Sequence, residues 1–284
     1  MAEKAKVLFM TSRPISWVNT AFPFAVGYLM MGGGIDSLLI IGTLFFLIPY
    51  NLLMYGINDV FDYESDMRNP RKGGVEGAVT PKRFHNLIIW SSILMSAPFV
   101  VALLLLGNKV SSAVLLIVLF FVLAYSAKHL RFKEIPFLDS VTSSMHFVGP
   151  LLFAYSLTTI NESALWAAGA FFLWGMASQA FGAVQDILPD REAGISSIAT
   201  RIGARYTVWF SAVLYTLAVI AVINVGIYAW PVAAAGVLYI ISTLQFTTIT
   251  DKTSAMARKG WKRFLWLNYL MGAIVTMSCL VSVI

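Results

Sequence analysis

Acidic side chains are scarce in this 284-residue sequence, and half of them fall into two short segments. Of the 14 Asp and Glu residues, the first segment holds Asp59, Asp62, Glu64 and Asp66, and the second holds Asp186, Asp190 and Glu192. The three aspartates of the first segment have i, i+3, i+7 spacing, which places them on one face of a helix. The two of the second have i, i+4 spacing, although Pro189 is expected to kink or end that helix. Carboxylates this close repel one another, so a bound multivalent cation would remove a penalty.

This pattern suits the binding of Mg²⁺ and a diphosphate. Mg²⁺ takes carboxylate oxygens, keeps several waters and fills its shell with phosphate oxygens. The candidate metal ligands are Asn58, Asp59, Asp62, Asp66, Asp186 and Asp190. The remaining phosphate oxygens need cations, and the candidates for this role are Arg13, Arg68, Arg71, Lys72, Lys128 and Arg131. The sequence has no G-x-x-x-x-G-K-[ST] loop, which argues against a nucleoside triphosphatase.

The two acidic segments also resemble each other, which indicates an internal repeat. Asn58-Asp59 and Gln185-Asp186 are both amide–acid pairs, and each is followed by another Asp and then by an arginine. The other interpretation is that two solvated acidic loops end two helices without further function. Two matched clusters are hard to obtain by chance, so we favour the repeat.

The composition indicates what must position these residues. The chain is 58% hydrophobic and 12% charged, which leaves too little polar surface to cover a soluble globule. Apolar segments of about 17 to 25 residues predict membrane-spanning helices, and the sequence has nine, at 15–33, 37–57, 84–106, 110–126, 137–159, 163–185, 206–227, 229–247 and 264–283. We therefore expect an all-α integral membrane protein. It would be a single transmembrane domain over residues 1–284, a bundle in which helices 5–8 repeat helices 1–4.

The basic residues predict the orientation of this bundle. Of the 20 Lys and Arg residues, all but Lys109 lie in the N-terminal segment or in the even-numbered loops. By the positive-inside rule, the N-terminus is cytoplasmic and the C-terminus is outside a cell membrane. Both acidic segments then border the cytoplasmic side, and the net charge of +6 needs no nucleic-acid partner. The single cysteine, Cys279, allows neither an intramolecular disulfide nor a cysteine zinc site.

Several motifs of the sequence resemble those of a known family. Residues 58–66, NDVFDYESD, match the N-D-x-x-D-x-x-x-D motif of the UbiA superfamily of intramembrane prenyltransferases, and residues 186–194, DILPDREAG, resemble its second aspartate motif. Tyr125-Ser126-Ala127-Lys128 resembles the tyrosine–lysine element after its fourth helix, and Ser12-Arg13-Pro14 resembles the entry to its first. The resemblance implies that the aspartates act with Tyr125 and Lys128 in catalysis. The sequence departs from the family at Leu188-Pro189, where many members have polar residues or glycine.

Longer strings are similar to one group within this superfamily, the bacterial lycopene elongases, which build C50 carotenoids. These strings are residues 12–20 (SRPISWVNT), 54–59 (MYGIND), 68–74 (RNPRKGG), 172–179 (FLWGMASQ) and 266–269 (WLNY). The resemblance implies that dimethylallyl diphosphate is the donor and lycopene the acceptor, extended at both ends through a C45 intermediate. A hydrocarbon acceptor also agrees with the sequence, because no Lys or Arg lies within a predicted span to hold a carboxylate.

Polar side chains inside apolar helices cost free energy and therefore predict function. Those inside the predicted spans are Asn19, Asn51, His146, Gln179, Gln185 and Asn268. Asn19 is a candidate substrate-binding residue. His146 is a candidate base, although an interhelical hydrogen bond would explain it as well. Asp139 is expected either at a helix start or as a residue that orients Lys128.

The expected reaction begins with ionisation of the diphosphate, and a terminal alkene then attacks the dimethylallyl cation. The tertiary cation that results loses a proton or captures water, and the sequence leaves both open. Aromatic faces stabilise cations, although bundle packing or an interfacial belt would also explain any one of the rings. The candidates are Trp17, Phe22, Phe24, Tyr28, Phe61, Phe147, Trp174 and Phe181. Three alternatives are the same enzyme class acting on a quinone or chlorin precursor, a secondary transporter, and a carotenoid cyclase subunit. A downstream carotenoid cyclase is also a candidate partner.

Overall fold

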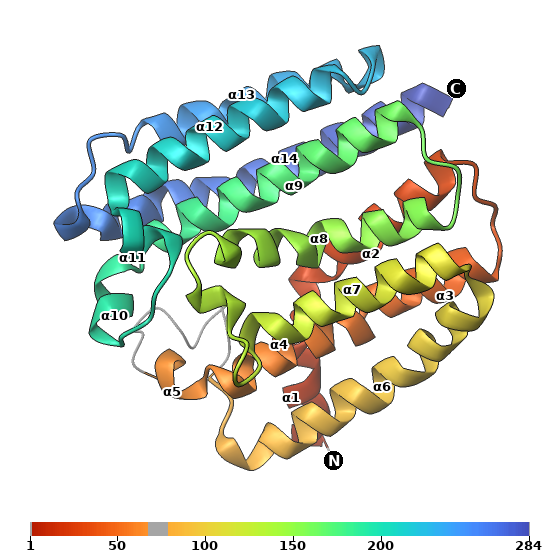
Figure 1. The fold of residues 1–284 in the computed structure, drawn as a ribbon, viewed down its shortest axis with the longest axis horizontal. Helices are drawn as coiled ribbons and strands as arrows, with labels where there is room; N and C mark the ends of the chain where they lie inside the picture. Colours follow the sequence, from red (N-terminus) through yellow and green to blue (C-terminus); the bar gives the residue numbers. More distant parts are fainter. Residues whose placement is uncertain (1, 68–78, 284) are drawn as a thin grey trace. The chain divides into compact units, whose positions relative to one another are not determined.

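The computed structural model describes residues 2–67 and 79–283, and the regular elements of this part of the chain are all helices (Figure 1). Arg68, Arg71 and Lys72, which were predicted to bind diphosphate, lie outside the described residues. The chain forms two compact units: unit 1 is Met1–Phe132 with His146–Thr159, and unit 2 is Lys133–Met145 with Ile160–Ile284. The break after Phe132 falls between the two predicted repeats, but half of the fifth predicted helix belongs to unit 1. The expectation of one domain over residues 1–284 stays a prediction.

Unit 1 is built from the N-terminal helices. Its elements are α1 (Ala2–Thr11), η1 (Pro14–Ser16), α2 (Trp17–Met30), α3 (Ser37–Leu47), α4 (Pro49–Phe61), α5 (Tyr63–Asp66), η2 (Lys82–Phe84), α6 (His85–Leu106), α7 (Lys109–Ser126) and the second part of α8 (Leu138–Ser156). Asp36 caps the start of α3, where its carboxylate accepts hydrogen bonds from the Leu39 amide and the Tyr28 hydroxyl. These two bonds favour the charged form and hold the pKa of Asp36 below its ordinary value.

Aromatic rings fill the core of unit 1. Phe24 of α2, Phe46 of α3 and Phe153 of α8 are fully buried, with ring centroids 5.2 to 5.9 Å apart. A Cβ on Gly42 would lie 2.1 Å from the Phe24 ring, so only glycine lets α3 approach α2 this closely. Phe24 is therefore a packing residue of this core, although it was one candidate for stabilising a cation.

A break at Pro49 separates α3 from α4 and brings the polar side chain of Asn51 into the core. Proline has no amide proton and cannot continue the α3 hydrogen-bond pattern. The Asn51 amide group is fully buried and donates to the carbonyls of Phe46 and Leu47 and to the Thr20 hydroxyl. The sequence predicted a function for this polar residue. The structure shows that its side chain donates to carbonyls that have lost their helical hydrogen bonds at the break.

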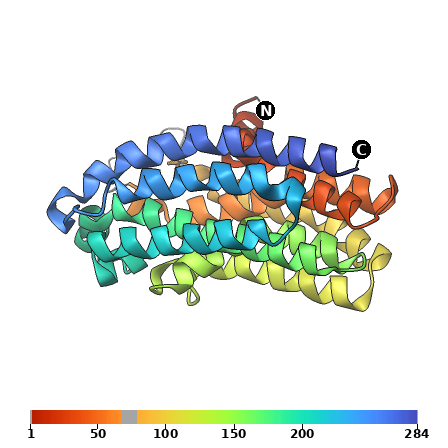
Figure 2. The ribbon, with the colours of Figure 1, turned by 90° about the horizontal axis from the view of Figure 1, so that it is seen from above.

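Unit 2 is built from the C-terminal helices. Its elements are the first part of α8, α9 (Glu162–Val184), α10 (Ile187–Glu192), α11 (Ile198–Ile202), α12 (Ala204–Ile223), η4 (Ile227–Ala229), α13 (Trp230–Leu244), η5 (Asp251–Ala257) and α14 (Arg258–Val283). Figure 2 shows α12, α13 and α14 side by side, and α12 also packs along α9.

Stacked rings again form the core of unit 2. The ring of Trp174 stacks on Phe264 at 5.6 Å and meets the edge of Tyr239 at 6.0 Å. Phe181 packs against Phe246 at 5.6 Å in a neighbouring cluster. The Tyr239 hydroxyl donates to Asn268, which accounts for one of the polar residues within the spans. Trp174 and Phe181 are thus core residues, as the packing interpretation of the aromatic residues expects.

Seven helical segments of the described residues are long and apolar enough to cross a membrane. They are Ser37–Phe61, Lys82–Leu106, Lys109–Ser126, Glu162–Val184, Ala204–Ile223, Ile227–Leu244 and Asp251–Val283. Helices also form at the other two predicted spans, but α2 has only 14 residues and the first half of α8 carries several buried Ser and Thr side chains with Asp139 and His146. The all-helical membrane fold is confirmed, whereas the number of nine crossings stays a prediction.

The role of Asn51 predicts a stability difference between two asparagines. Asn51→Ala removes the side-chain donor of the Leu47 carbonyl and one of the two donors of the Phe46 carbonyl, which also accepts from the Thr20 hydroxyl. We expect this variant to lower the unfolding free energy by about 1–3 kcal/mol. Asn19 lies on the exposed side of α2, and Asn19→Ala should change that free energy by no more than about 0.5 kcal/mol. Thermal unfolding of the purified variants in detergent compares the two, and equal effects would contradict this role.

Candidate active site

The first aspartate motif stands where α4 ends. Asp59 lies in the last turn of α4, Asp62 is its C-cap with φ −97° and ψ 0°, and Asp66 is the last residue of the short α5. The Asp66 amide still donates to the Asp62 carbonyl at 2.8 Å. The prediction of one continuous helix face for the three aspartates is therefore interrupted at Asp62, where α4 stops and a separate turn carries Asp66.

Electrostatics explains why this helix end needs cations. Asp59 and Asp62 are each only 3% exposed, and the C-terminal end of a helix carries partial negative charge. Two buried carboxylates at such an end are unfavourable unless positive groups compensate them. Arg13 supplies one such group, because its Nη2 donates to Oδ1 of Asp59 at 2.8 Å. The Nη2 of Arg131 lies 3.7 Å from Oδ1 of Asp62 and supplies a second.

The backbone around Arg13 is shaped to present this side chain. Arg13 has φ 49° and ψ 75°, in the left-handed region that non-glycine residues rarely adopt. The indole N–H of Trp17 donates to the Ser12 carbonyl and hydroxyl, which holds the turn between α1 and α2. The Arg13 guanidinium also lies over the Tyr55 ring, 4.1 Å from its centroid. Tyr55 precedes Asp59 by one helical turn, so one face of α4 holds both partners of Arg13.

Two further elements reach the same helix end. The Asn58 amide nitrogen donates to Oδ2 of Asp62 and to the hydroxyl of Ser126, the last residue of α7. Because this nitrogen is engaged, Asn58 would contact a metal through its Oδ1. Arg131 follows in the loop after α7, also with a left-handed backbone at φ 43°, and its Nη1 approaches the Phe61 carbonyl at 3.5 Å. Unit 1 therefore brings together the predicted residues Asn58, Asp59, Asp62, Arg13 and Arg131.

The predicted catalytic pair Tyr125 and Lys128 lies at the end of α7 and just beyond it. The Tyr125 ring meets the His146 ring edge to face at a centroid distance of 4.9 Å. His146 is buried, its Nε2 lies 3.4 Å from the Phe121 carbonyl, and its own carbonyl accepts from the Tyr50 hydroxyl. These contacts match the interhelical interpretation of His146 rather than that of a base. Lys128 is exposed in the loop, and Asn19 lies on an exposed face of α2.

The second aspartate motif repeats this arrangement in unit 2. Helix α9 ends at Val184, Asp186 is the N-cap residue of α10, and Asp190 lies one turn later with its amide donating to the Asp186 carbonyl at 2.9 Å. Pro189 stands in the first turn of α10, where a missing amide proton costs little. The proline therefore does not disturb the turn between the two aspartates, although α9 ends before it as the sequence predicts. Both carboxylates are partly buried.

Several polar residues of unit 2 hold the backbone near this motif. Asp139, in the first turn of α8, is 1% exposed and accepts from the Ile198 amide at the start of α11, at 2.9 Å. The prediction of a helix-start residue is correct, and the carboxylate caps a second helix in addition. Gln185 donates to the Gly182 carbonyl, and Gln179 accepts from Ser143. These polar residues within the spans therefore bond to other parts of unit 2.

The donor chemistry of the first motif fits Mg²⁺. Within residues 2–67 and 79–283, no group of three or more His, Cys, Asp or Glu side chains is placed to hold a metal ion by itself. Mg²⁺ in phosphate-transferring sites is commonly bound by one or two carboxylates, with substrate phosphates and water completing the octahedron. Asp59 and Asp62, buried one turn apart beside the Asn58 amide, offer that number of carboxylates.

The apolar helices define a multi-pass membrane protein, and the match to a family of prenyltransferases makes it an enzyme of prenyl transfer. The chain belongs to the UbiA prenyltransferase family, whose profile matches residues 20–277. It is 53% identical to a lycopene elongase/hydratase of Corynebacterium glutamicum over 279 residues, which are 98% of this chain and 97% of that protein. It is 50% identical to the C50 β-cyclic carotenoids biosynthesis protein LbtBC of a Dietzia species, covering 98% of this chain and 65% of that protein.

Solved structures share the fold. A UbiA homologue of Archaeoglobus fulgidus, bound to DMAPP and Mg²⁺, superposes with a TM-score of 0.67 over 93% of this chain and 98% of its own, at 17% identity. A digeranylgeranylglyceryl phosphate synthase superposes with a TM-score of 0.68 over 98% of both chains, at 19% identity. At these identities the likeness concerns the fold.

Sequence reasoning missed three partners of the motif residues. Ser126 accepts from Asn58, Tyr55 lies under Arg13, and Asp251 pairs with Arg191 of the second motif. Tyr55 and Ser126 stand inside strings that had been noted, but nothing in their spacing predicts the contact. Asp251 is an isolated acid at the start of η5, and its pairing depends on the fold.

The Arg13–Asp59 pair predicts a stability loss that a second mutation relieves. Arg13→Gln removes the guanidinium that pairs with the buried Asp59 carboxylate, and we expect it to lower the unfolding free energy by about 1–3 kcal/mol without Mg²⁺. Adding Asp59→Asn should recover part of that loss, because the buried charge that Arg13 compensates is then absent. Arg83→Gln, which breaks an exposed pair with Glu3, is the matched control and should have little effect. Chemical unfolding measures five proteins: the parent chain, the three single variants Arg13→Gln, Asp59→Asn and Arg83→Gln, and the double variant. If Arg13→Gln lowers the unfolding free energy equally in the parent and in the Asp59→Asn background, the pairing is contradicted.

Proposed function

We propose that this protein transfers dimethylallyl groups from dimethylallyl diphosphate to the ends of lycopene. The observation that carries the proposal is the 53% identity with a lycopene elongase/hydratase over nearly the whole of both chains. The aspartate motifs at the ends of α4 and α9 support the same chemistry, because a diphosphate leaving group needs metal ions and cations. Names of relatives do not specify the products, so the C45 and C50 acyclic carotenoids are part of the proposal.

In this proposal Asn58, Asp59, Asp62 and Asp66 of the first motif, with Asp186 and Asp190 of the second, hold Mg²⁺. The A. fulgidus homologues bound to DMAPP or GPP together with Mg²⁺ support this choice of ion. When bound, Mg²⁺ supplies positive charge that stabilises the departing diphosphate.

The chain's own groups complete the binding of the diphosphate. Arg13 and Arg131 compensate Asp59 and Asp62 in the structure. A metal ion would take over that compensation, and either guanidinium could then bind a phosphate oxygen through its fork of donors. Lys128, exposed in the loop after α7, would add a third cation, and the Tyr125 hydroxyl would donate to the bridging or terminal oxygens. Arg68, Arg71, Lys72 and Asn19 complete the proposed substrate-binding set.

The reaction would break the C–O bond of the donor and form a C–C bond to the terminal alkene carbon of lycopene. The bonding electrons of the C–O bond leave with the diphosphate, and the alkene electron pair forms the new bond, which leaves a tertiary cation on the acceptor. The word hydratase in the names of the relatives supports water as the group that adds to this cation, with release of a proton. Loss of a proton from carbon is the other way to end the reaction.

Two alternatives to lycopene elongation are each supported by a specific observation. A protein of similar fold is named as a digeranylgeranylglyceryl phosphate synthase and not as a carotenoid enzyme, so a quinone or chlorin precursor is a second candidate acceptor. A secondary transporter would agree with the apolar helices and the repeated motif. It would not explain the buried carboxylates at helix ends, because carrier sites usually lie near the middle of the bilayer.

The length of the Dietzia relative supports a proposed partner. This chain covers 65% of that protein, whose name assigns it to cyclic carotenoids. We infer that the remaining part of that relative acts after elongation, and that a separate carotenoid cyclase takes the product of the present chain.

A product assay tests the proposed function. Membranes with the protein, Mg²⁺, dimethylallyl diphosphate and lycopene should yield products with one and two added five-carbon units, resolved by chromatography and mass. EDTA should abolish them, and Asp62→Ala should lower the rate at least about 100-fold, as expected for a metal ligand. Glu64→Ala is the matched control, because Glu64 is exposed and pairs with Lys82.

The competing functions give different results in the same experiment. Turnover of geranylgeranyl diphosphate with 4-hydroxybenzoate, and none of lycopene, would keep the metal site and discard the acceptor. No turnover of either pair by folded protein, with metal-dependent flux into liposomes, would favour the transporter.

The proposed orientation has the N-terminus in the cytoplasm and the C-terminus outside the cell membrane. In a Cys279→Ser background, a membrane-impermeant maleimide should label Lys109→Cys in intact cells, because the segment before α7 lies outside. The matched variant Lys252→Cys should be labelled only after permeabilisation. Both lysines are exposed, so access to the reagent depends on the side of the membrane. The reverse pattern would contradict the orientation.

A further inference from the structure

The second aspartate motif lies on α10, a helix that is too short to be stable or to keep its orientation by itself. Helix α10 has six residues and α11 has five, and isolated helices of this length are not stable in water. Their position must therefore come from contacts with longer elements of unit 2. At its start, α10 is anchored by Ile187, which is fully buried in the core.

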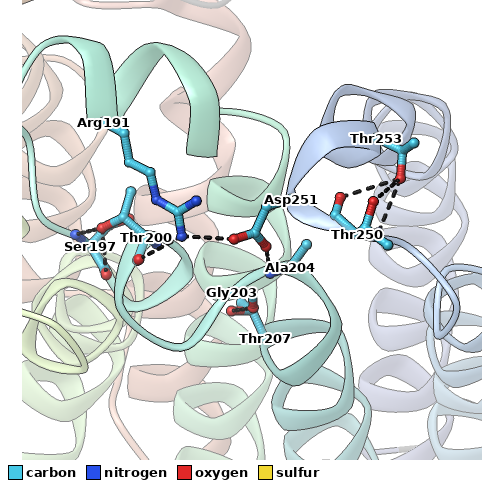
Figure 3. A network of polar contacts seen from close by, with 9 residues as sticks. All are labelled: Arg191, Ser197, Thr200, Gly203, Ala204, Thr207, Thr250, Asp251 and Thr253. Atoms are coloured by element: carbon cyan, nitrogen blue, oxygen red, sulfur yellow. Dashed lines mark hydrogen bonds and ion pairs between the residues drawn. The ribbon is translucent and has the colours of Figure 1, made fainter.

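Arg191 provides the contact at the other end of α10. Its Nη2 donates to the Thr200 carbonyl at 3.0 Å and lies 2.8 Å from Oδ2 of Asp251 (Figure 3). The second oxygen of Asp251 accepts from the Ala204 amide at 2.7 Å, so this carboxylate joins α10 to the start of α12. Asp251 begins η5, which packs against both α9 and α10.

Gly203 allows Asp251 to come this close. Its φ of +83° lies in the region that favours glycine, and a Cβ there would stand 3.1 Å from Oδ1 of Asp251. The turn between α11 and α12 is therefore shaped around the carboxylate (Figure 3). A pair that is 44% and 36% exposed adds little stability as a surface ion pair. Its geometric role is larger, because the pair and its hydrogen bonds connect four elements, α10, α11, α12 and η5.

Because Arg191 lies on the same short helix as the two aspartates, its contact with Asp251 affects where their carboxylates point. Asp186 and Asp190 are four residues apart and share a face of the turn, whereas Arg191 is rotated by about 100° from Asp190. With Ile187 fixed in the core, the hold on Arg191 sets the rotation of α10 about its axis. We propose that Arg191 and Asp251 are positioning residues whose ion pair aims the Asp186 and Asp190 carboxylates for metal–diphosphate binding. This inference rests on the proposed function of the second motif.

The competing role for Arg191 is direct binding of a phosphate oxygen, and Asp251→Asn separates the two. Asparagine keeps an oxygen for the Ala204 amide but loses the charge that holds Arg191. If Arg191 were a phosphate ligand, Asp251→Asn would release it and would not weaken diphosphate binding. If the pair positions α10, Arg191→Gln and Asp251→Asn should have similar effects, and the double variant should be no weaker than the weaker single variant.

The test is calorimetric titration of the purified protein in nanodiscs with inorganic diphosphate at fixed Mg²⁺. We expect each single variant to raise Kd about 10- to 100-fold, as changes behind metal ligands do. Arg201→Gln is the matched control and should leave Kd unchanged, because Arg201 is an exposed arginine of α11. An unchanged Kd in Asp251→Asn, or additive effects in the double variant, would overturn the proposal.

Amide hydrogen exchange without ligand tests the same pair independently of the proposed function. In both single variants, the amides of residues 187–203 should exchange roughly 5- to 10-fold faster than in the parent protein, and those of α13 should not change. If the parent protein binds no diphosphate, the proposed function fails, and the exchange pattern then decides whether the pair holds α10. Unchanged exchange over residues 187–203 would overturn the proposal in either case.

Discussion

The structure depends on how negative charge is tolerated at the ends of long apolar helices. Helices α4 and α9 both end at an aspartate motif, and at the end of α4 the helix dipole already disfavours the carboxylates of Asp59 and Asp62. The side chains of Asp59 and Asp62 are themselves almost completely removed from solvent. Positive groups must therefore come from elsewhere in the chain, and Arg13 and Arg131 bring them from the segments before α2 and after α7. The same requirement makes these helix ends suitable for a metal ion and a diphosphate.

The surrounding fold serves this requirement through irregular backbone. Left-handed backbone at Arg13 and Arg131 places the two guanidinium groups, and the break at Pro49 gives α4 its own start. Asn51 compensates that break from within the core. In unit 2, the short helices α10 and α11 take their positions from Asp139, Arg191 and Asp251 rather than from their own stability. Left-handed backbone and ion pairs thus lie at the motif residues, while stacked aromatic rings fill the core of each unit.

Much of this could be predicted from the sequence because the signals are local. Apolar segments predicted where helices form, and the spacing of Asp59, Asp62, Asp186 and Asp190 predicted carboxylates at helix ends. The interruption at Asp62 was not predicted, because the same spacing fits a continuous helix. The role of Asn51 was also missed, since a polar residue in an apolar segment indicates function or a backbone defect equally well.

Contacts between distant segments could not be predicted in this way. Arg13 and Asp59 are 46 residues apart along the chain, and no periodicity connects them. Asp251 carries no motif at all, so its contact with Arg191 emerges only when η5 packs on α10. The acceptor is likewise beyond local signals: an apolar bundle agrees with a hydrocarbon, and relatedness to lycopene elongases carries the choice.

The central claim is that the carboxylates of both motifs hold Mg²⁺ for a prenyl diphosphate. The most direct measurement is binding of an unreactive thio analogue of dimethylallyl diphosphate to the purified protein in nanodiscs, with and without Mg²⁺, for the parent chain, Asp62→Ala and Asp190→Ala. Saturable binding that requires Mg²⁺ and is lost in both variants is the predicted result. Binding that persists without Mg²⁺, or that either variant leaves intact, would contradict the account.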